Sequence, residues 1–164
     1  MTRWMRLAGL VWLMHGSATA AASATMLVDV QGARVSVDTI LHKGPALLWF
    51  TNLCDNCQAA IPALDALTRT LAGTRVSVTG VSFIPGDRDR VAALLHERKP
   101  AFPILLDPGG AVTERFTGVK PEDICPVVNA VMLDAKGRVI FRGHYPGTDP
   151  AELERRLREA ARKR

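Results

Sequence analysis

The chain has 164 residues and a formal net charge of +5 at pH 7, and this length suits one domain with a single core. Residues 152–164 hold six basic and three acidic side chains, so much of the excess positive charge is local to the C-terminal end. Because no aromatic residues are interleaved there, we expect a solvated helix face and no nucleic-acid partner.

The first element in the chain, residues 1–24, has the order of a secretory signal peptide. Two arginines precede a short apolar run, and small residues end in Ala22-Ser23-Ala24. We expect cleavage after Ala24, with an earlier site after Ala20 and an uncleaved membrane anchor as the alternatives. Residues 25–164 then form one exported domain, for which the predicted location is the periplasm, an oxidising compartment.

Hydrophobic periodicity predicts the next elements. Residues 27–41 indicate a β-hairpin that turns at Gln31-Gly32, and the almost wholly apolar residues 46–51 indicate a strand covered on both faces. After a cysteine motif, residues 58–72 carry apolar side chains at helical spacing. Pro62 lies inside this helix and is expected to kink it.

The second half of the chain continues the alternation of strands and helices. The expected elements are a strand over 75–84, a helix capped by Asp87, a strand over 102–106, a short helix over 111–116, a hairpin of 127–133 with 138–142, and a last helix with Asp149 as N-cap and Glu152 placed to reach back to it. This order predicts an α/β fold in which helices flank a central mixed sheet that also carries an N-terminal β-hairpin.

The motif that carries the chemistry is Cys54-Asp55-Asn56-Cys57, at the junction between the buried strand and the helix. The helix N-terminus presents free N–H groups and a positive dipole end, which favour a thiolate on Cys54. Cys57 is one turn further on and is close enough to resolve a mixed disulfide. Half of a zinc site and a structural disulfide are the alternatives, but no second C-x-x-C or H-x-x-H pair supplies further zinc ligands.

With this motif in its context, the chain resembles the thioredoxin superfamily, and most closely the exported TlpA/ResA-like thiol-disulfide oxidoreductases. The resemblance covers nearly the whole chain after residue 24 and rests on residues 47–62, which include Pro62, and on residues 102–107 and 132–139. It implies a thioredoxin-like fold and exchange of disulfides with exported proteins, without a bound organic cofactor. The implied partners are an apocytochrome c, a copper protein or a membrane electron donor.

The sequence departs from this family at three places. Leu53 stands where a tryptophan usually precedes the first cysteine. The family has a cis-proline directly before the closing-hairpin strand, and here either Pro126 is that proline, displaced by two residues, or no cis-proline exists. The third cysteine, Cys125, precedes Pro126 in the loop that the fold places against the motif. We therefore expect Cys125 and Pro126 to border the site.

Cys125 opens a second interpretation, because Sco-like copper proteins share this fold and hold copper with two cysteines and a histidine from this loop. Three thiolates, from Cys54, Cys57 and Cys125, would suit the soft ion Cu(I). Sco-like proteins have three residues between the cysteines, however, and this chain has two. His144 follows the closing hairpin and is expected to be solvent-exposed.

A third interpretation is a thiol peroxidase, since Thr51-Asn52-Leu53-Cys54 is similar to the T-x-x-C of peroxiredoxins. Leu47 stands where their proline would be, and no arginine is placed by the sequence. Thr51 is otherwise a residue at the end of a strand.

Asp55 lies between the two cysteines, and its carboxylate opposes the helix dipole at Cys54. A disfavoured thiolate makes a disulfide less oxidising, which points to a reductant. The prediction from sequence is a monomeric periplasmic thiol-disulfide oxidoreductase in which Cys54 attacks and Cys57 resolves.

Overall fold

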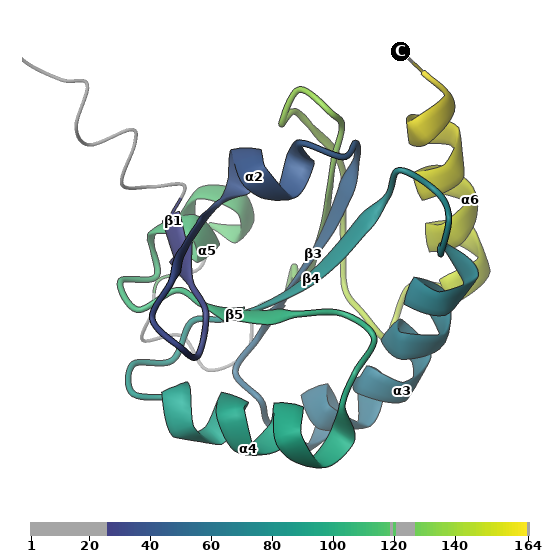
Figure 1. Ribbon diagram of the computed structural model, residues 1–164. Coiled ribbons are helices and arrows are strands. Elements are labelled where there is room, and N and C mark those ends of the chain that lie inside the picture. Colours follow the sequence, from purple (N-terminus) through teal and green to yellow (C-terminus); the bar gives the residue numbers. More distant parts are fainter. Residues whose placement is uncertain (1–25, 119, 121–126, 164) are drawn as a thin grey trace, which may run out of the picture.

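The computed structural model describes residues 26–118, 120 and 127–163, and within them the protein is built around one seven-stranded mixed sheet (Figure 1). The strands are β1 (Met26–Val28), β2 (Arg34–Ser36), β3 (Ala46–Thr51), β4 (Ser77–Ser82), β5 (Ile104–Leu106), β6 (Ala130–Leu133) and β7 (Val139–Gly143). Their order across the sheet is β2-β1-β5-β4-β3-β6-β7. The predicted mixed sheet with an N-terminal hairpin is confirmed.

Helices cover both faces of this sheet. They are α2 (Val37–Leu41), α3 (Asp55–Thr70), α4 (Arg88–Arg98), α5 (Ala111–Thr117) and α6 (Pro150–Arg162). One hydrophobic cluster joins the sheet to α3, α4 and α6, and a second joins its other face to α2 and α5 (Figure 1). No helix in the described ranges has the length and apolar character needed to cross a membrane.

Strand β3 lies at the centre and positions the cysteine motif. It pairs in parallel with β4 and antiparallel with β6, and all six of its residues are buried. Its side chains alternate, so that Leu47 and Trp49 enter the cluster under α3 while Leu48 and Phe50 enter the other. The motif follows at the carboxyl end of β3, where α3 begins.

The N-terminal hairpin is followed directly by a helix that the periodicity did not predict. The pairing of β1 with β2 ends at Ser36. The Ser36 hydroxyl caps α2 by accepting a hydrogen bond of 3.0 Å from the Thr39 N–H. Val37 and Leu41, four residues apart, are buried against the sheet. The expectation of a hairpin up to residue 41 was therefore wrong beyond Ser36, because a serine cap ends the strand.

Two expected caps differ from the structure and one is confirmed. Asp149 caps α6 by accepting from the Ala151 N–H at 3.0 Å. Glu152 does not reach back to the N-cap. Its two carboxylate oxygens instead accept from Arg155 and Arg156, because side chains three and four residues apart on a helix face each other. Asp87 is the N-cap residue of α4, as predicted, but its side chain makes no cap, because its carboxylate accepts from Ser82 Oγ at 2.8 Å.

Candidate active site

Cys54 is the N-cap of α3, with φ −64° and ψ 167°, and Cys57 lies in the first turn. The helix therefore begins at Asp55, three residues earlier than the apolar spacing predicts, and it runs unbroken past Pro62. The predicted junction between a buried strand and a helix N-terminus is confirmed. Free N–H groups of the first turn are thus available to the sulfur of Cys54.

The two cysteines form a pair of free thiols at the surface. Their sulfur atoms lie 3.2 Å apart, and both residues are partly exposed. A disulfide needs about 2.05 Å between the sulfurs, so an approach of little more than 1 Å closes the bond. The pair is consequently placed for reversible oxidation without a change in the fold.

The thiol of Cys54 is the more acidic of the two. Burial raises its pKa, but hydrogen bonds with the Cys57 thiol and with the backbone N–H groups of Cys57 and Asn56 outweigh this, so that the pKa lies below its ordinary value. Asp55 opposes them through its negative charge, as the sequence predicts, but its effect is the smallest of these. The expectation of a disfavoured thiolate on Cys54 was therefore wrong, because the hydrogen bonds at the helix start outweigh this charge. Cys54 is the group suited to attack.

The pKa of the Cys57 thiol is shifted in the opposite direction. Burial raises its pKa, and the neighbouring Cys54 raises it further, against a lowering by a hydrogen bond with Thr51. Cys57 therefore stays protonated while Cys54 ionises. This division of roles is what an attacking and a resolving cysteine require.

Thr51 and Asn52 support the motif from the end of β3. Thr51 is fully buried, and its hydroxyl accepts from the Leu53 N–H at 2.9 Å and bonds to Cys57. The side-chain oxygen of Asn52 accepts from the Cys54 N–H at 3.2 Å and from the Cys57 thiol at 3.4 Å. Asn52 is not among the predicted site residues, because its burial, which makes a hydrogen-bonded role necessary, is visible only in the structure.

Leu53, directly before Cys54, has an unusual backbone. Its φ is 54°, in the left-handed region, which costs about 1–2 kcal/mol for a residue with a side chain. Its carbonyl accepts from Gln58 Nε2 at 2.9 Å and from the guanidinium of Arg90. Arg90 lies on α4, 37 residues away, and no local pattern in the sequence indicates this contact.

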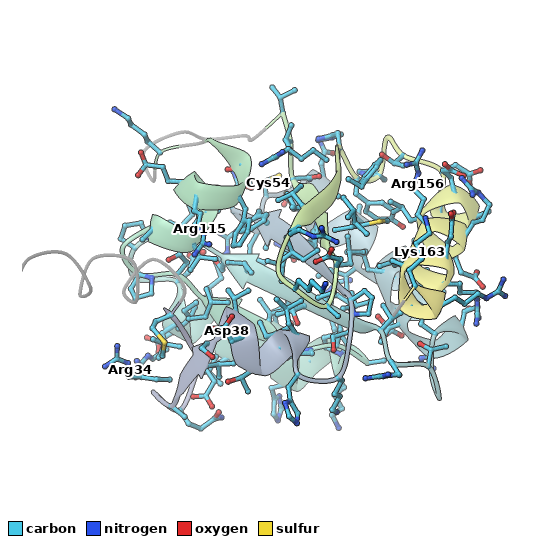
Figure 2. All side chains as sticks on the ribbon, turned by 90° about the horizontal axis from the view of Figure 1, so that it is seen from above. Arg34, Asp38, Cys54, Arg115, Arg156 and Lys163 are labelled. Atoms are coloured by element: carbon cyan, nitrogen blue, oxygen red, sulfur yellow. The ribbon has the colours of Figure 1, made fainter. Side chains whose placement is uncertain are left out.

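Figure 2 shows where the motif lies on the molecule. Cys54 is well separated from Arg34 and Asp38, which belong to β2 and α2, and from Lys163 at the end of α6. The two labelled basic residues at the C-terminal end, Arg156 and Lys163, thus lie apart from Cys54. The charges of the C-terminal helix are largely occupied by ion pairs along the helix, such as those of Arg155 and Arg158 with glutamates.

Cys125 and Pro126 lie outside the described residues, so the three-sulfur copper site and the cis-proline stay predictions. In the described part of the chain, no group of three or more histidine, cysteine or acidic side chains is placed to hold a metal ion. A cis peptide bond is present between Tyr145 and Pro146. His144 is exposed, as the sequence predicts.

Solved structures share this fold at low sequence identity. A secreted Mycobacterium tuberculosis disulfide oxidoreductase homologous to E. coli DsbE superposes with a TM-score of 0.63 and 19% identity, over 85% of this chain and 98% of that one. A thiol:disulfide interchange protein of the thioredoxin family from Chlorobium tepidum TLS gives 0.65 and 19%, over 83% and 92%. The peroxidoxin BcpB from Mycobacterium tuberculosis gives 0.65 and 20%, over 85% and 92%.

These likenesses confirm the thioredoxin-like fold that the sequence predicts. No curated protein matches the sequence. The AhpC/TSA family, in contrast, matches residues 18–142, which is well over half of the chain. The matched range includes strand β3, the motif from Cys54 to Cys57, and the closing hairpin of β6 and β7 up to its last residue but one. The chain therefore belongs to the AhpC/TSA family.

Proposed function

We propose that the protein is a periplasmic thiol-disulfide oxidoreductase that exchanges disulfides with exported protein partners. The observation that carries the proposal is the pair of sulfurs 3.2 Å apart whose thiol pKa values move in opposite directions. The lowered pKa of Cys54 supplies a nucleophilic thiolate, and the raised pKa of Cys57 keeps the second thiol protonated until the resolving step. The signal-like residues 1–24 support export, and no organic cofactor is needed.

The reaction has two exchange steps in the reducing direction. The Cys54 thiolate attacks a disulfide of the partner, which forms a mixed disulfide and releases one partner sulfur as a thiolate that takes up a proton. Cys57 then loses its proton and attacks the Cys54 sulfur, which releases the second partner sulfur. The partner gains two electrons, and the Cys54–Cys57 pair loses two as it becomes a disulfide.

A reducing role in the cell requires a membrane electron donor that returns the pair to the dithiol. Asp55 favours this direction because its charge raises the pKa of Cys54, although the hydrogen bonds at the helix start lower it more. The expected partners are an apocytochrome c or a copper protein, in keeping with a place in cytochrome c biogenesis. We expect the protein to act as a monomer.

Reduction of insulin by dithiothreitol tests the proposal. The wild type should accelerate it, Cys54→Ser should abolish the acceleration, and Cys57→Ser should trap mixed disulfides. Cys125→Ser is the matched cysteine control and should retain the activity. A wild type that fails to accelerate the reaction, or a Cys54→Ser variant that retains full activity, would contradict the proposal.

Cu(I) delivery is the second candidate, with Cys54, Cys57 and Cys125 as ligands, and two free thiols 3.2 Å apart favour it as well. Titration of the reduced protein with Cu(I) in the presence of a competing chelator separates the two functions. Stoichiometric binding that is lost in Cys125→Ser supports the copper function. Equal, weak binding by the wild type and Cys125→Ser argues against it.

Thiol peroxidase activity is the third candidate, and membership of the AhpC/TSA family favours testing it. The hydroxyl of Thr51 bonds to Cys57 and Leu53, however, whereas a peroxide-activating threonine would face the attacking Cys54. We therefore expect slow consumption of hydrogen peroxide. Fast consumption that Thr51→Val abolishes, while insulin reduction persists, would establish the peroxidase instead.

A further inference from the structure

The backbone before Cys54 is held in a conformation that a leucine rarely adopts. Leu53 has φ 54° and is fully buried, and Cys54 follows it directly in an extended conformation. This turn of the chain directs the Cys54 sulfur to the N–H groups of Asn56 and Cys57. Whatever fixes Leu53 therefore also fixes the reactive sulfur.

Arg90 contacts this segment through two successive carbonyl groups. One guanidinium nitrogen donates to the Leu53 carbonyl, and the other donates to the Asn52 carbonyl at 3.4 Å. The guanidinium is a planar fork of donors, whereas a lysine ammonium is a single point of charge. The geometry matches a clamp on the backbone, and Gln58 adds one more donor to the Leu53 carbonyl.

The clamp is itself anchored in the fold. Asp87 is buried and accepts from Ser82 Oγ at 2.8 Å, and its other oxygen lies 3.9 Å from Arg90. Ser82 ends β4 and is the register partner of Thr51, which ends β3. The chain Ser82, Asp87, Arg90 thus ties the carboxyl end of β4 to the backbone just before Cys54.

We propose that Arg90 is a positioning residue for Cys54, which acts by clamping the carbonyls of Asn52 and Leu53 so that the Cys54 sulfur faces the start of α3. The importance of this role for turnover rests on the proposed exchange function. The clamp itself concerns only the reactivity of the reduced thiol. Arg90 touches neither a partner protein nor the reacting sulfur in this role.

The pH profile of Cys54 alkylation by iodoacetamide, measured on the reduced full chain, tests the clamp. Arg90→Gln should move the midpoint up by about half a pH unit, which lowers the thiolate fraction at pH 7 about threefold. Arg90→Lys should resemble Arg90→Gln, because it keeps the charge but not the fork. Arg88→Gln, an exposed arginine of the same helix turn, is the control and should leave the profile unchanged.

Two results would overturn the inference. An unchanged profile in Arg90→Gln means that Arg90 does not position Cys54, and a wild-type profile in Arg90→Lys means that charge alone acts. Asp87→Asn keeps an oxygen that accepts from Ser82 but removes the charge beside Arg90, so it should shift the pH profile in the same direction by less. This variant tests the clamp even if Arg90→Gln folds poorly. Because alkylation needs no partner, a wild type inactive on insulin would sink the exchange function and leave the clamp testable.

Discussion

The side-chain oxygen of Asn52 lies 3.4 Å from the sulfur of Cys57, and it also accepts from the backbone N–H of Cys54. One amide thus bonds to both cysteines of the motif. As an acceptor, it fixes the direction of the Cys57 thiol. Asn52 therefore holds both cysteines from a buried position directly after β3.

Asn52→Ala should remove this orientation. The Cys54 N–H and the Cys57 thiol lose their shared acceptor, so we expect the free energy of unfolding of the reduced protein to fall by about 1–2 kcal/mol. The mixed disulfide should also live longer, since Cys57 is no longer directed to Cys54. Urea unfolding and quenched exchange with a model disulfide measure the two effects. Asn56→Ala, at an exposed position of the same motif, should change both little, and equal effects in the two variants would refute this role.

Asp55→Asn should make the cysteine pair more oxidising. The substitution removes a negative charge that raises the pKa of Cys54, so the pKa falls further and the thiolate of the reduced form is stabilised. A charge in the first turn of a helix is worth about 0.3–1 kcal/mol, which corresponds to a few tenths of a pKa unit. The equilibrium constant with glutathione should shift toward the dithiol. Asp89→Asn, in the first turn of α4, is the control, and a shift toward the disulfide would contradict the sign.

Alkylation of the reduced protein should modify Cys54 first across neutral pH. The pKa of Cys54 lies below its ordinary value of 9.0 and that of Cys57 above it, so between the two the first is a thiolate and the second a thiol. The rate should rise with pH with a midpoint below pH 9, and peptide mapping should find one adduct. Early modification of Cys57 would reverse the proposed roles.

The same two shifts set opposite trends in stability. The lowered pKa of Cys54 contributes stability that is full above the unfolded value and is lost as the pH falls through the folded one. The raised pKa of Cys57 contributes stability that is full below the unfolded value and is lost as the pH rises through the folded one. Reduced Cys54→Ser protein should therefore lose more stability above pH 9 than reduced Cys57→Ser protein.

Local patterns in the sequence were sufficient for most of the fold. The apolar run of β3, the helical spacing after Cys57 and the Asp149 cap each depend on near neighbours in the chain. Helix α2 was not predicted because its five residues are too few to show a helical periodicity. The sequence feature that indicates it is Ser36, which caps its N-terminus. Asp87 occupies the predicted N-cap position, but its side chain makes no cap because its partner Ser82 precedes it in the chain.

The candidate site likewise contains residues that the sequence predicts and residues that only the structure reveals. The cysteines and Thr51 are adjacent in sequence, and their placement at a strand-to-helix junction follows from periodicity alone. The contact of Arg90 with Leu53 depends on how α4 packs against the sheet, which no sequence spacing records. Asn52 was overlooked because its burial, and not its position, makes it informative.

Asn129→Ala should destabilise the end of the sheet next to the motif. The buried Asn129 side chain donates to the Tyr145 carbonyl at 2.9 Å and accepts from the Tyr145 N–H at 2.6 Å, while its backbone carbonyl accepts from the Phe50 N–H at 2.8 Å. Alanine leaves two buried backbone groups without partners, at a cost of about 1–3 kcal/mol each. Thermal unfolding measures the loss, and His144→Ala, next to Tyr145 but exposed, should have little effect. If Asn129→Ala unfolds at the same temperature as His144→Ala, the two hydrogen bonds do not hold β6 against the segment that follows β7.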